Sequence, residues 1–352
     1  MISTTNELQQ FLANCSETGG QRICAIDTEA DSLHRYKESL CLIQFTVGNE
    51  CVLIDPLAID DLSPLDHYLR EATVWMHGAD YDMTMLKREF AHIPPTVYDT
   101  QIGARLLGVK QFGLGNLVEH YFDIVLSKSS QKADWGKRPL SEKMIDYALN
   151  DVRYLLEMGD IICTQLKEKG RYEWFTESCE AARTKVDERD DSKDEQWRIG
   201  GSGKLDPYGL ACLRALWNWR DVEAAAWDRP SFMVATNRQL IEWSQRLTEK
   251  KKIELPHHFR TDRVKRYKEA METLAKLPKS EWPTRPVKKR RKRNSDFDNK
   301  VDGLIAQRNS IAAELDIDSS LIISRSVIET LAANEAQPAD LLMKWQIELL
   351  GM

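Results

Sequence analysis

Apolar runs and amphipathic stretches alternate along the first half of the chain. The apolar runs are short and rich in β-branched residues, as in strands, and the amphipathic stretches repeat at helical spacing. A tight turn at Gly48-Asn49 joins two of the runs. The predicted strands cover residues 22–28, 40–47, 51–54, 73–77 and 97–98. The predicted helices cover residues 5–12, 62–71, 81–90, 99–107, 113–121 and 141–169. Strands that alternate with helices in this way indicate an α/β domain whose sheet is covered on both faces.

The second half of the chain shows helical periodicity and no dominant strand pattern. Helices are predicted at residues 208–228, 237–250 and 261–276, and the segment after residue 296 reads as helical again. Two stretches with few apolar residues separate these parts, one highly charged and one basic with prolines. The resulting domain prediction is an α/β domain at 1–184, a charged linker at 185–202, a helical domain at 203–281, a basic linker at 282–297 and a second helical domain at 298–352.

The two helical segments read as diverged copies of one unit. Residues 219–234 align with residues 307–323, so that Arg220 meets Arg308 and two alanine pairs coincide. Alanine and leucine are common in helices, so chance similarity is the alternative interpretation. We favour a true repeat.

Charge is distributed unevenly over these parts. Residues 1–200 contain 34 Asp and Glu against 22 Lys and Arg, whereas residues 201–352 contain 21 against 27. A basic half suits a protein that binds a polyanion, because each neutralised phosphate releases counterions. The alternative is that surface charge simply varies between domains.

Composition also limits the compartment. No run of about 18 apolar residues exists, so we expect no membrane span. The N-terminus lacks the basic flank and apolar core of a signal peptide. The seven scattered cysteines form no CxxC pair, which favours a reducing compartment over a disulfide framework or a zinc ribbon. We therefore expect a cytoplasmic protein.

Acidic residues gather where predicted strands end. Asp27 and Glu29 are two positions apart at the end of the first strand, so their side chains share a face, and Asp31 follows at the same spacing. Asp82 lies in the first turn of the helix after the fourth strand, and it reaches the same place if these two strands are neighbours. The alternatives are that the first acids are merely solvated and that Asp82 stabilises the start of a helix.

A third acidic position lies on the long predicted helix at 141–169. Tyr147 and Asp151 are four residues apart, on one helix face, and Asp151 sits among apolar residues where an unpaired charge is unfavourable. Together these residues offer oxygen ligands without His or Cys, which suits Mg²⁺ or Mn²⁺ rather than zinc. Two such ions about 3.5–4 Å apart can bind both the attacking and the leaving oxygen of a phosphodiester.

The motifs that carry these acids resemble a known enzyme family. IDTEAD (26–31), HGADYDMTML (77–86) and YALNDV (147–152) are similar to the three exonuclease motifs of the DEDD superfamily, Tyr subclass. YDTQIGARLL (98–107) and the text of 126–155 resemble ribonuclease D in particular. Residues 203–281 and 298–352 resemble the HRDC domain, a helical nucleic-acid-binding module found twice in ribonuclease D, the second match being weaker.

The resemblance implies a fold and an activity. The expected fold is a ribonuclease H-like α/β exonuclease domain with a mixed central sheet flanked by helices, followed by one or two small all-α HRDC domains. Tyr147 would orient the water that attacks the terminal phosphodiester and releases a nucleoside 5′-monophosphate from a free RNA 3′ end. Transfer RNA precursors are the typical substrate of the family, and we expect a monomer. Two divalent ions, Mg²⁺ or Mn²⁺, would be held by Asp27, Glu29, Asp82 and Asp151.

Two other activities remain open at this stage. Related nucleases of the Tyr subclass act on DNA ends, and the motif residues do not separate RNA from DNA. A non-catalytic RNA-binding adaptor is the third possibility, and the intact set of acids argues against it.

Weaker candidates surround the motifs. His77 is a candidate for contact with a substrate phosphate, or it closes the end of the fourth strand. Four residues in the loop before the Tyr147 helix are candidates for gripping the RNA backbone, with plain surface charge as the alternative: Lys128, Lys132, Trp135 and Arg138. Four tryptophans at helical spacing are expected in the core rather than as base-stacking platforms: Trp217, Trp219, Trp227 and Trp243. The basic run at 288–293 is interpreted as part of a linker that contacts phosphates.

Overall fold

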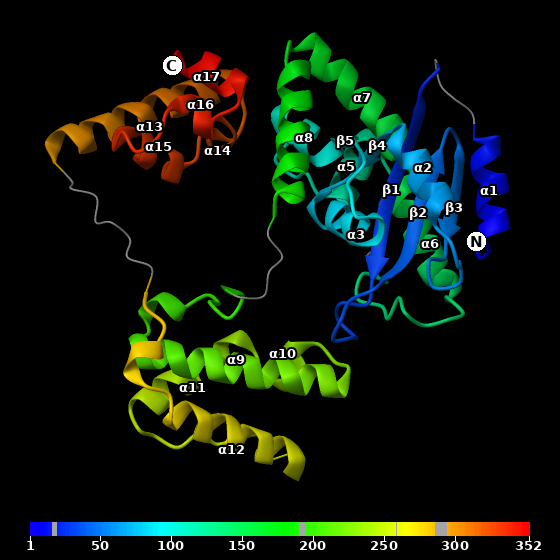
Figure 1. Ribbon diagram of the computed structural model, residues 1–352. Coiled ribbons are helices and arrows are strands. Elements are labelled where there is room, and N and C mark those ends of the chain that lie inside the picture. The colour runs from blue at the N-terminus through cyan, green and yellow to red at the C-terminus, as the bar shows by residue number, and fades with distance from the viewer. Residues whose placement is uncertain (16–19, 128, 190–194, 258, 286–293) are drawn as a thin grey trace. The chain divides into compact units, whose positions relative to one another are not determined.

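The computed structural model describes residues 1–15, 20–127, 129–189, 195–257, 259–285 and 294–352 (Figure 1). The basic run at 288–293 therefore lies outside the described residues, as does Lys128. The chain divides into two compact units. The first comprises Met1–Ala30, Leu40–Arg189 and Arg291–Met352, and the second comprises Asp31–Ser39 and Asp190–Arg290.

A mixed five-stranded sheet forms the centre of the first unit. Its strands are β1 (Arg22–Ala30), β2 (Leu40–Val47), β3 (Glu50–Ile54), β4 (Ala72–Met76) and β5 (Thr96–Asp99). Their order is β3-β2-β1-β4-β5. The pairs β1–β2 and β2–β3 are antiparallel, whereas β1–β4 and β4–β5 are parallel. The mixed sheet that the family resemblance implied is thus confirmed, and β1 lies next to β4.

Helices cover both faces of this sheet, as the alternating pattern predicts. Phe45 on one face packs with apolar side chains of α1 (Thr5–Asn14), α2 (Ser63–Arg70) and α3 (Asp80–Phe90). Trp75 on the other face packs in a core that four further helices of the domain share. These are α4 (Thr100–Leu106), α5 (Leu114–Phe122), α7 (Leu155–Glu168) and α8 (Tyr172–Asp187). Asp99 caps α4 as expected, since its carboxylate accepts the Gln101 N–H at 2.8 Å.

The helix predicted at 141–169 is two helices, which corrects the sequence interpretation. α6 (Glu142–Arg153) ends and α7 begins at Tyr154, whose φ of −100° and ψ of −6° interrupt the regular helix. The break lets α6 pack on β2 and β3 while α7 packs on β1 and β4. Helix α8 was not predicted, although its buried Phe175 and Cys179 are four residues apart, the spacing of one helix face.

The second unit is helical. α9 (Pro207–Trp227), α10 (Ser231–Val234), α11 (Asn237–Thr248) and α12 (Thr261–Ala275) enclose a core that contains Leu216, Trp219 and Trp243. Short 3₁₀ turns lie at Ser202–Lys204 and Lys279–Glu281. The loop between β1 and β2 belongs to this unit: Arg35 pairs with Asp228 at 3.2 Å, and Arg229 donates to the His34 carbonyl.

The C-terminal helices of the first unit repeat the pattern of α9 to α11. They are α13 (Ser295–Leu315), α14 (Ser319–Ile322), α15 (Arg325–Ala332), α16 (Pro338–Leu341) and α17 (Lys344–Leu350). Both α9 and α13 are 21 residues long and end at an aspartate with positive φ, Asp228 and Asp316. Arg220 donates to the carbonyl 15 residues later, at Ala235, and Arg308 donates likewise to Ile323. These shared features agree with the internal repeat that the sequence predicts.

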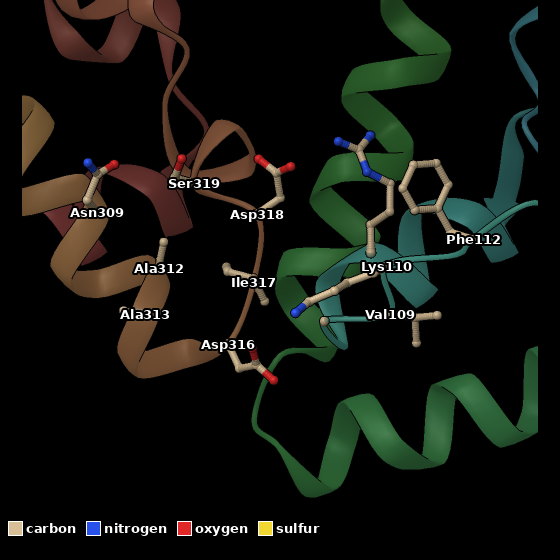
Figure 2. Close-up of a pocket in the computed structure, with 12 residues that line it drawn as sticks. Val109, Lys110, Phe112, Asn309, Ala312, Ala313, Asp316, Ile317, Asp318 and Ser319 are labelled. Atoms are coloured by element: carbon tan, nitrogen blue, oxygen red, sulfur yellow. The ribbon is translucent and has the colours of Figure 1, made fainter.

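The repeated C-terminal helices pack within the first unit. Trp345 stacks on Trp174 with ring centroids 5.0 Å apart, and the Glu177 carboxylate accepts the Lys344 N–H at 2.8 Å. A cavity of about 520 Å³ lies between residues 105–112 and residues 309–319 (Figure 2). None of the described helices combines the length and apolar character needed to cross a membrane.

Candidate active site

Strand β1 supplies two carboxylates to one face of the sheet. Asp27 lies opposite Gln44 of β2 and Glu29 lies opposite Leu42, so both acids point to the side that α6 covers. Asp31 does not join them, although its two-residue spacing from Glu29 predicts the same face in a continued strand. It lies beyond the end of β1, and its buried carboxylate accepts the Ser39 N–H at 2.7 Å, which fixes the loop instead.

Asp82 comes from the first turn of α3, directly after β4. Because β1 and β4 are parallel neighbours, this turn lies beside the end of β1. The Asp82 carboxylate accepts hydrogen bonds from the backbone N–H of Thr28 at 2.9 Å and from its hydroxyl at 2.6 Å. The condition set in the sequence interpretation, that the first and fourth strands be neighbours, is therefore met.

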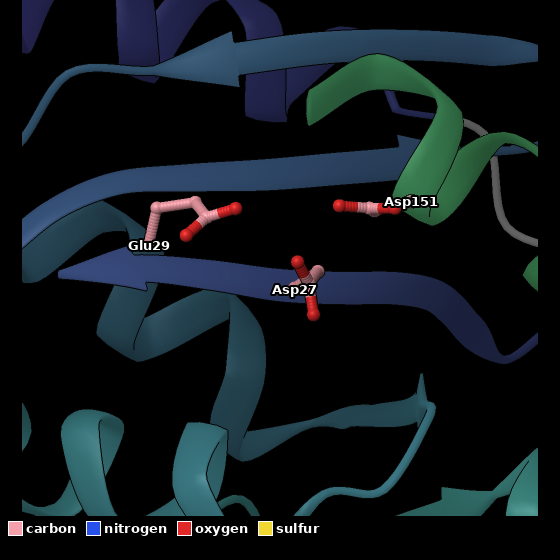
Figure 3. A group of neighbouring side chains, drawn as sticks. All are labelled: Asp27, Glu29 and Asp151. Atoms are coloured by element: carbon pink, nitrogen blue, oxygen red, sulfur yellow. The ribbon is translucent and has the colours of Figure 1, made fainter. Parts of the chain in front are cut away.

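Helix α6 brings the last two motif residues to the same place. Its buried Ala148 and Val152 anchor it against the protein, and Ser141 caps its start. Tyr147 and Asp151 lie one helical turn apart on the face toward β1. Asp27, Glu29 and Asp151 each offer a carboxylate oxygen, and these atoms all lie within 4.8 Å of one another (Figure 3).

One cavity joins all five motif residues. It has a volume of about 420 Å³ and is open to the surface. We refer to Asp27, Glu29, Asp82 and Asp151, which all line it, as the acidic cluster. Tyr147 and His77 line the same cavity, as do Gly113, Gly115 and Asn116 at the start of α5. The α5 residues were not predicted; the two glycines at a helix start were the only signal in the sequence.

The charges of the acidic cluster oppose one another. Burial, with repulsion from Asp151 and Asp82, raises the pKa of Glu29 to about 8. Burial also raises the pKa of Asp151 to about 7, although hydrogen bonding with Tyr147 lowers it. The pKa of Asp82 rises to about 6 through burial, against the two hydrogen bonds from Thr28. The pKa of Asp27 is raised well above its ordinary value, by burial and then by repulsion from the Asp82 carboxylate.

This arrangement fits divalent cations. The acidic cluster offers hard carboxylate oxygens and brings like charges close together. Both properties suit a hard divalent cation such as Mg²⁺ or Mn²⁺. The Tyr147 hydroxyl keeps its proton, because burial and the Asp151 charge raise its pKa. It is therefore a hydrogen-bonding group rather than a base.

His77 has a defined orientation at the cavity. Its Nδ1 lies 2.9 Å from the Thr100 hydroxyl, which donates to the Met76 carbonyl at 3.2 Å. A hydroxyl that has used its proton must accept, so we assign the proton to Nδ1 and leave Nε2 as an acceptor. Burial lowers the His77 pKa, which favours this neutral form.

The loop candidates for RNA contact are placed differently. Trp135 is 1% exposed and packs beside Tyr147, and the Arg138 guanidinium donates to Asp55 and to the carbonyls of Cys41 and Trp135. Trp135 is buried in the core and the Arg138 guanidinium is hydrogen-bonded within the domain, so neither side chain is available to contact RNA. Lys132 is exposed and does not line the cavity, and Lys128 lies outside the described residues.

Comparison with known proteins agrees with this geometry. Residues 1–169 match the family model described as 3′-5′ exonuclease, and residues 209–252 match that of the HRDC domain. A ribonuclease D of Pseudomonas paraeruginosa is 31% identical over 80% of this chain and 79% of its own length. One of Cronobacter turicensis is 34% identical, with 62% of this chain matched; the chain spans 60% of that relative's length.

Solved structures show the same fold. The crystal structure of Escherichia coli RNase D, described as an exoribonuclease involved in structured RNA processing, superposes with a TM-score of 0.76 at 24% identity, over 100% of this chain and 98% of that one. A protein from Bifidobacterium adolescentis superposes with a TM-score of 0.81 at 24% identity, over 99% and 94% of the two chains.

Proposed function

Because the chain belongs to the ribonuclease D family of 3′–5′ exoribonucleases, we propose that it removes nucleotides hydrolytically from free RNA 3′ ends at the acidic cluster. The observation that carries this proposal is the convergence of three carboxylate oxygens from β1 and α6 within 4.8 Å, in a cavity open to the surface. The fourth acid, Asp82, lines the same cavity.

We propose that the acidic cluster holds two divalent ions, Mg²⁺ or Mn²⁺. When bound, such ions lower the pKa of water and stabilise charge on a phosphodiester. The chain's own contribution is the placement of the carboxylates. Thr28 fixes Asp82 through two hydrogen bonds, and the buried face of α6 fixes Asp151.

Tyr147 would position the attacking water. Its hydroxyl stays protonated and lines the cavity beside Asp151, so it can donate or accept a hydrogen bond at the reacting phosphodiester. Hydrolysis then releases a nucleoside 5′-monophosphate.

His77 would read the sugar of the terminal nucleotide rather than the phosphate. Its Nε2 has no hydrogen-bond partner among the described residues and carries a lone pair. A lone pair accepts from a ribose hydroxyl, whereas a phosphate oxygen needs a donor. This proposal differs from both sequence interpretations of His77, contact with a substrate phosphate and closure of the strand end. It favours RNA over DNA, because only RNA carries the 2′-hydroxyl.

The second unit would hold the body of a structured RNA such as a tRNA precursor. Residues 201–290 of this unit contain 20 Lys and Arg against 11 Asp and Glu, and Trp227 is 44% exposed at the end of α9. The Arg263 guanidinium lies 4.9 Å from the centre of the Trp227 ring, beside a cavity that Arg260 also lines. An exposed ring next to cationic groups is the combination that binds single-stranded bases.

We also propose that the enzyme acts in the cytoplasm as a monomer. All seven cysteines carry free thiols, as is usual for proteins of reducing compartments.

The test is a timed digestion of matched RNA and DNA oligomers, with free and blocked 3′ ends, with and without Mg²⁺ or Mn²⁺. We expect metal-dependent loss of single nucleotides from the free RNA end. Asp27→Asn should slow cleavage by more than roughly 100-fold, the upper range for residues that only support a metal ligand. Its RNA affinity should change little. Wild-type protein that binds RNA and leaves it intact in all conditions would refute the proposed hydrolysis.

A further inference from the structure

Gln44 is a buried amide that has no hydrogen-bond partner among the described residues. It lies in the middle of β2, a strand in which all eight residues are buried, and its own exposed fraction is 0%. Neither its Nε2 nor its Oε1 makes a hydrogen bond within the described part of the chain. Buried amides almost always have partners, because losing both water and protein hydrogen bonds is unfavourable.

The register places this amide beside the acidic cluster. Gln44 lies directly opposite Asp27 of β1 and, on its other side, opposite Leu53 of β3. The three side chains form a row on the face that α6 covers. Cβ atoms of such opposed residues lie about 4.5–5.5 Å apart, so the longer Gln44 side chain can reach the Asp27 carboxylate.

Packing alone does not explain a glutamine here. Leu53, the next residue in the row, is 3% exposed and packs with Trp135, Leu140 and Ala148. An apolar side chain of similar length at position 44 would pack on the same face without leaving polar atoms unpaired. The amide must therefore be useful in a state in which it gains a partner.

We propose that Gln44 is a positioning residue for the metal site: its Nε2–H group donates to the Asp27 carboxylate when divalent ions are bound. The inference rests on the function proposed above. One carboxylate oxygen can face an ion while the other accepts an N–H, and such outer hydrogen bonds orient metal ligands. An amide with no partner among the described residues is the cost of keeping this donor in place.

The experiment combines metal binding with thermal stability, both measured without RNA. Gln44→Met keeps the length of the side chain and removes its polar atoms. We expect Mn²⁺ affinity, from calorimetry or electron paramagnetic resonance, to fall roughly 10-fold or more. The melting temperature of the metal-free variant should equal or exceed that of the wild type, because an unsatisfied amide has been removed.

Gln346→Met is the matched control. Gln346 is also buried, at 8% exposure, but its amide is satisfied: Nε2 donates to the Leu321 carbonyl and Oε1 accepts the Met343 N–H, both at 2.8 Å. The same substitution there should lower the melting temperature and leave Mn²⁺ affinity unchanged.

Two results would overturn the inference. The first is Mn²⁺ affinity of Gln44→Met equal to wild type, and the second is a melting temperature lowered as far as in Gln346→Met. If Gln44→Met does not fold, Gln44→Asn keeps the amide and shortens its reach, and unchanged Mn²⁺ affinity in that variant would refute the contact. If either result is obtained while the wild-type protein cleaves RNA, only the inference about Gln44 is refuted. If the wild-type protein neither cleaves RNA nor binds Mn²⁺, the proposed function itself is refuted.

Discussion

Within the acidic cluster, each carboxylate is destabilised by its neighbours and by burial. The shared cause explains why the pKa values of all four acids shift upward together. Ionising the cluster in the metal-free protein is unfavourable, and divalent cations remove that penalty.

This electrostatic conflict predicts how stability depends on pH. Between about pH 4.5 and pH 8 the folded protein holds a proton on Glu29 that the unfolded chain releases. Raising the pH through this window therefore favours unfolding, so this group's contribution to the free energy of unfolding decreases. We expect the difference in melting temperature between metal-free wild type and Glu29→Gln to grow in favour of the variant as pH rises.

Thermal melts of both proteins across this window, with and without Mg²⁺, provide the measurement. Saturating Mg²⁺ should raise the melting temperature of the wild type at high pH and leave that of Glu29→Gln unchanged. A difference that stays constant with pH would mean that Glu29 titrates normally in the folded protein.

The orientation of His77 predicts sugar selectivity. His77→Phe removes the acceptor and keeps a ring of similar size, so the ratio of RNA to DNA cleavage rates should fall roughly 3- to 10-fold, the value of one hydrogen bond. Thr100→Val, which removes the hydroxyl that fixes the ring, should change the ratio in the same direction by less. Equal slowing of RNA and DNA in initial-rate assays would show that His77 does not read the sugar.

Some residue positions followed from the sequence and others did not. Alternation along a strand placed Asp27 and Glu29 on one face, and helical spacing did the same for Tyr147 and Asp151. Arg138 was misjudged because its partner Asp55 is 83 residues away, a tertiary contact that local pattern cannot encode. The prediction that Asp31 shares the face of Asp27 and Glu29 was wrong, because β1 ends at Ala30 and the loop that follows decides where the strand stops.

At the scale of elements, the strand predictions match the structure to within two residues at each end. Apolar runs between turns mark strands well because a buried strand needs every position apolar or paired. The break at Tyr154 was not visible, since amphipathic periodicity continues from α6 into α7 and the interruption serves packing on different strands.

Helix α9 gives a prediction for RNA binding. Trp227 was expected in the core with its three neighbours, yet Trp219 and Trp243 are buried whereas Trp227 is 44% exposed. Trp227→Ala should weaken binding of single-stranded RNA roughly 5-fold or more, the loss of one stacked base. Val222→Ala, at a 57% exposed position of the same helix, is the control. The dissociation constants of both variants for single-stranded RNA are measured by fluorescence anisotropy. Equal values for Trp227→Ala and Val222→Ala would exclude Trp227 as a stacking platform.

For the whole molecule, the sequence located the acidic and the basic half, and the family resemblance supplied the expectation of a mixed central sheet flanked by helices. The sequence did not indicate that residues 31–39 belong to the helical second unit. It also did not indicate that helices α13 to α17 belong to the first unit with the sheet. Both depend on contacts between distant segments, such as Arg35 with Asp228 and Trp174 with Trp345.

The basic half predicts a change in salt dependence. Three exposed cations of the second unit are replaced together in a Gln variant: Arg260, Lys265 and Lys268. If all three contact phosphates, the slope of log affinity against log salt should become shallower by about 2, from about 0.7 per contact for a single strand. Cleavage of a very short RNA should stay unchanged, since the acidic cluster is intact. An unaltered slope in a salt titration would place the RNA on another surface.

The matching Arg220 and Arg308 contacts have an evolutionary consequence. Each arginine ties the long helix of its module to a carbonyl after the short helix, and both ties persist although the surrounding sequences have drifted apart. A duplication that preserves this internal brace would free the outer positions of each copy to diverge, and in the C-terminal copy Trp345 packs on Trp174 of the sheet domain. The outer positions of α9 to α12 are thus a natural place for laboratory evolution of new RNA preferences.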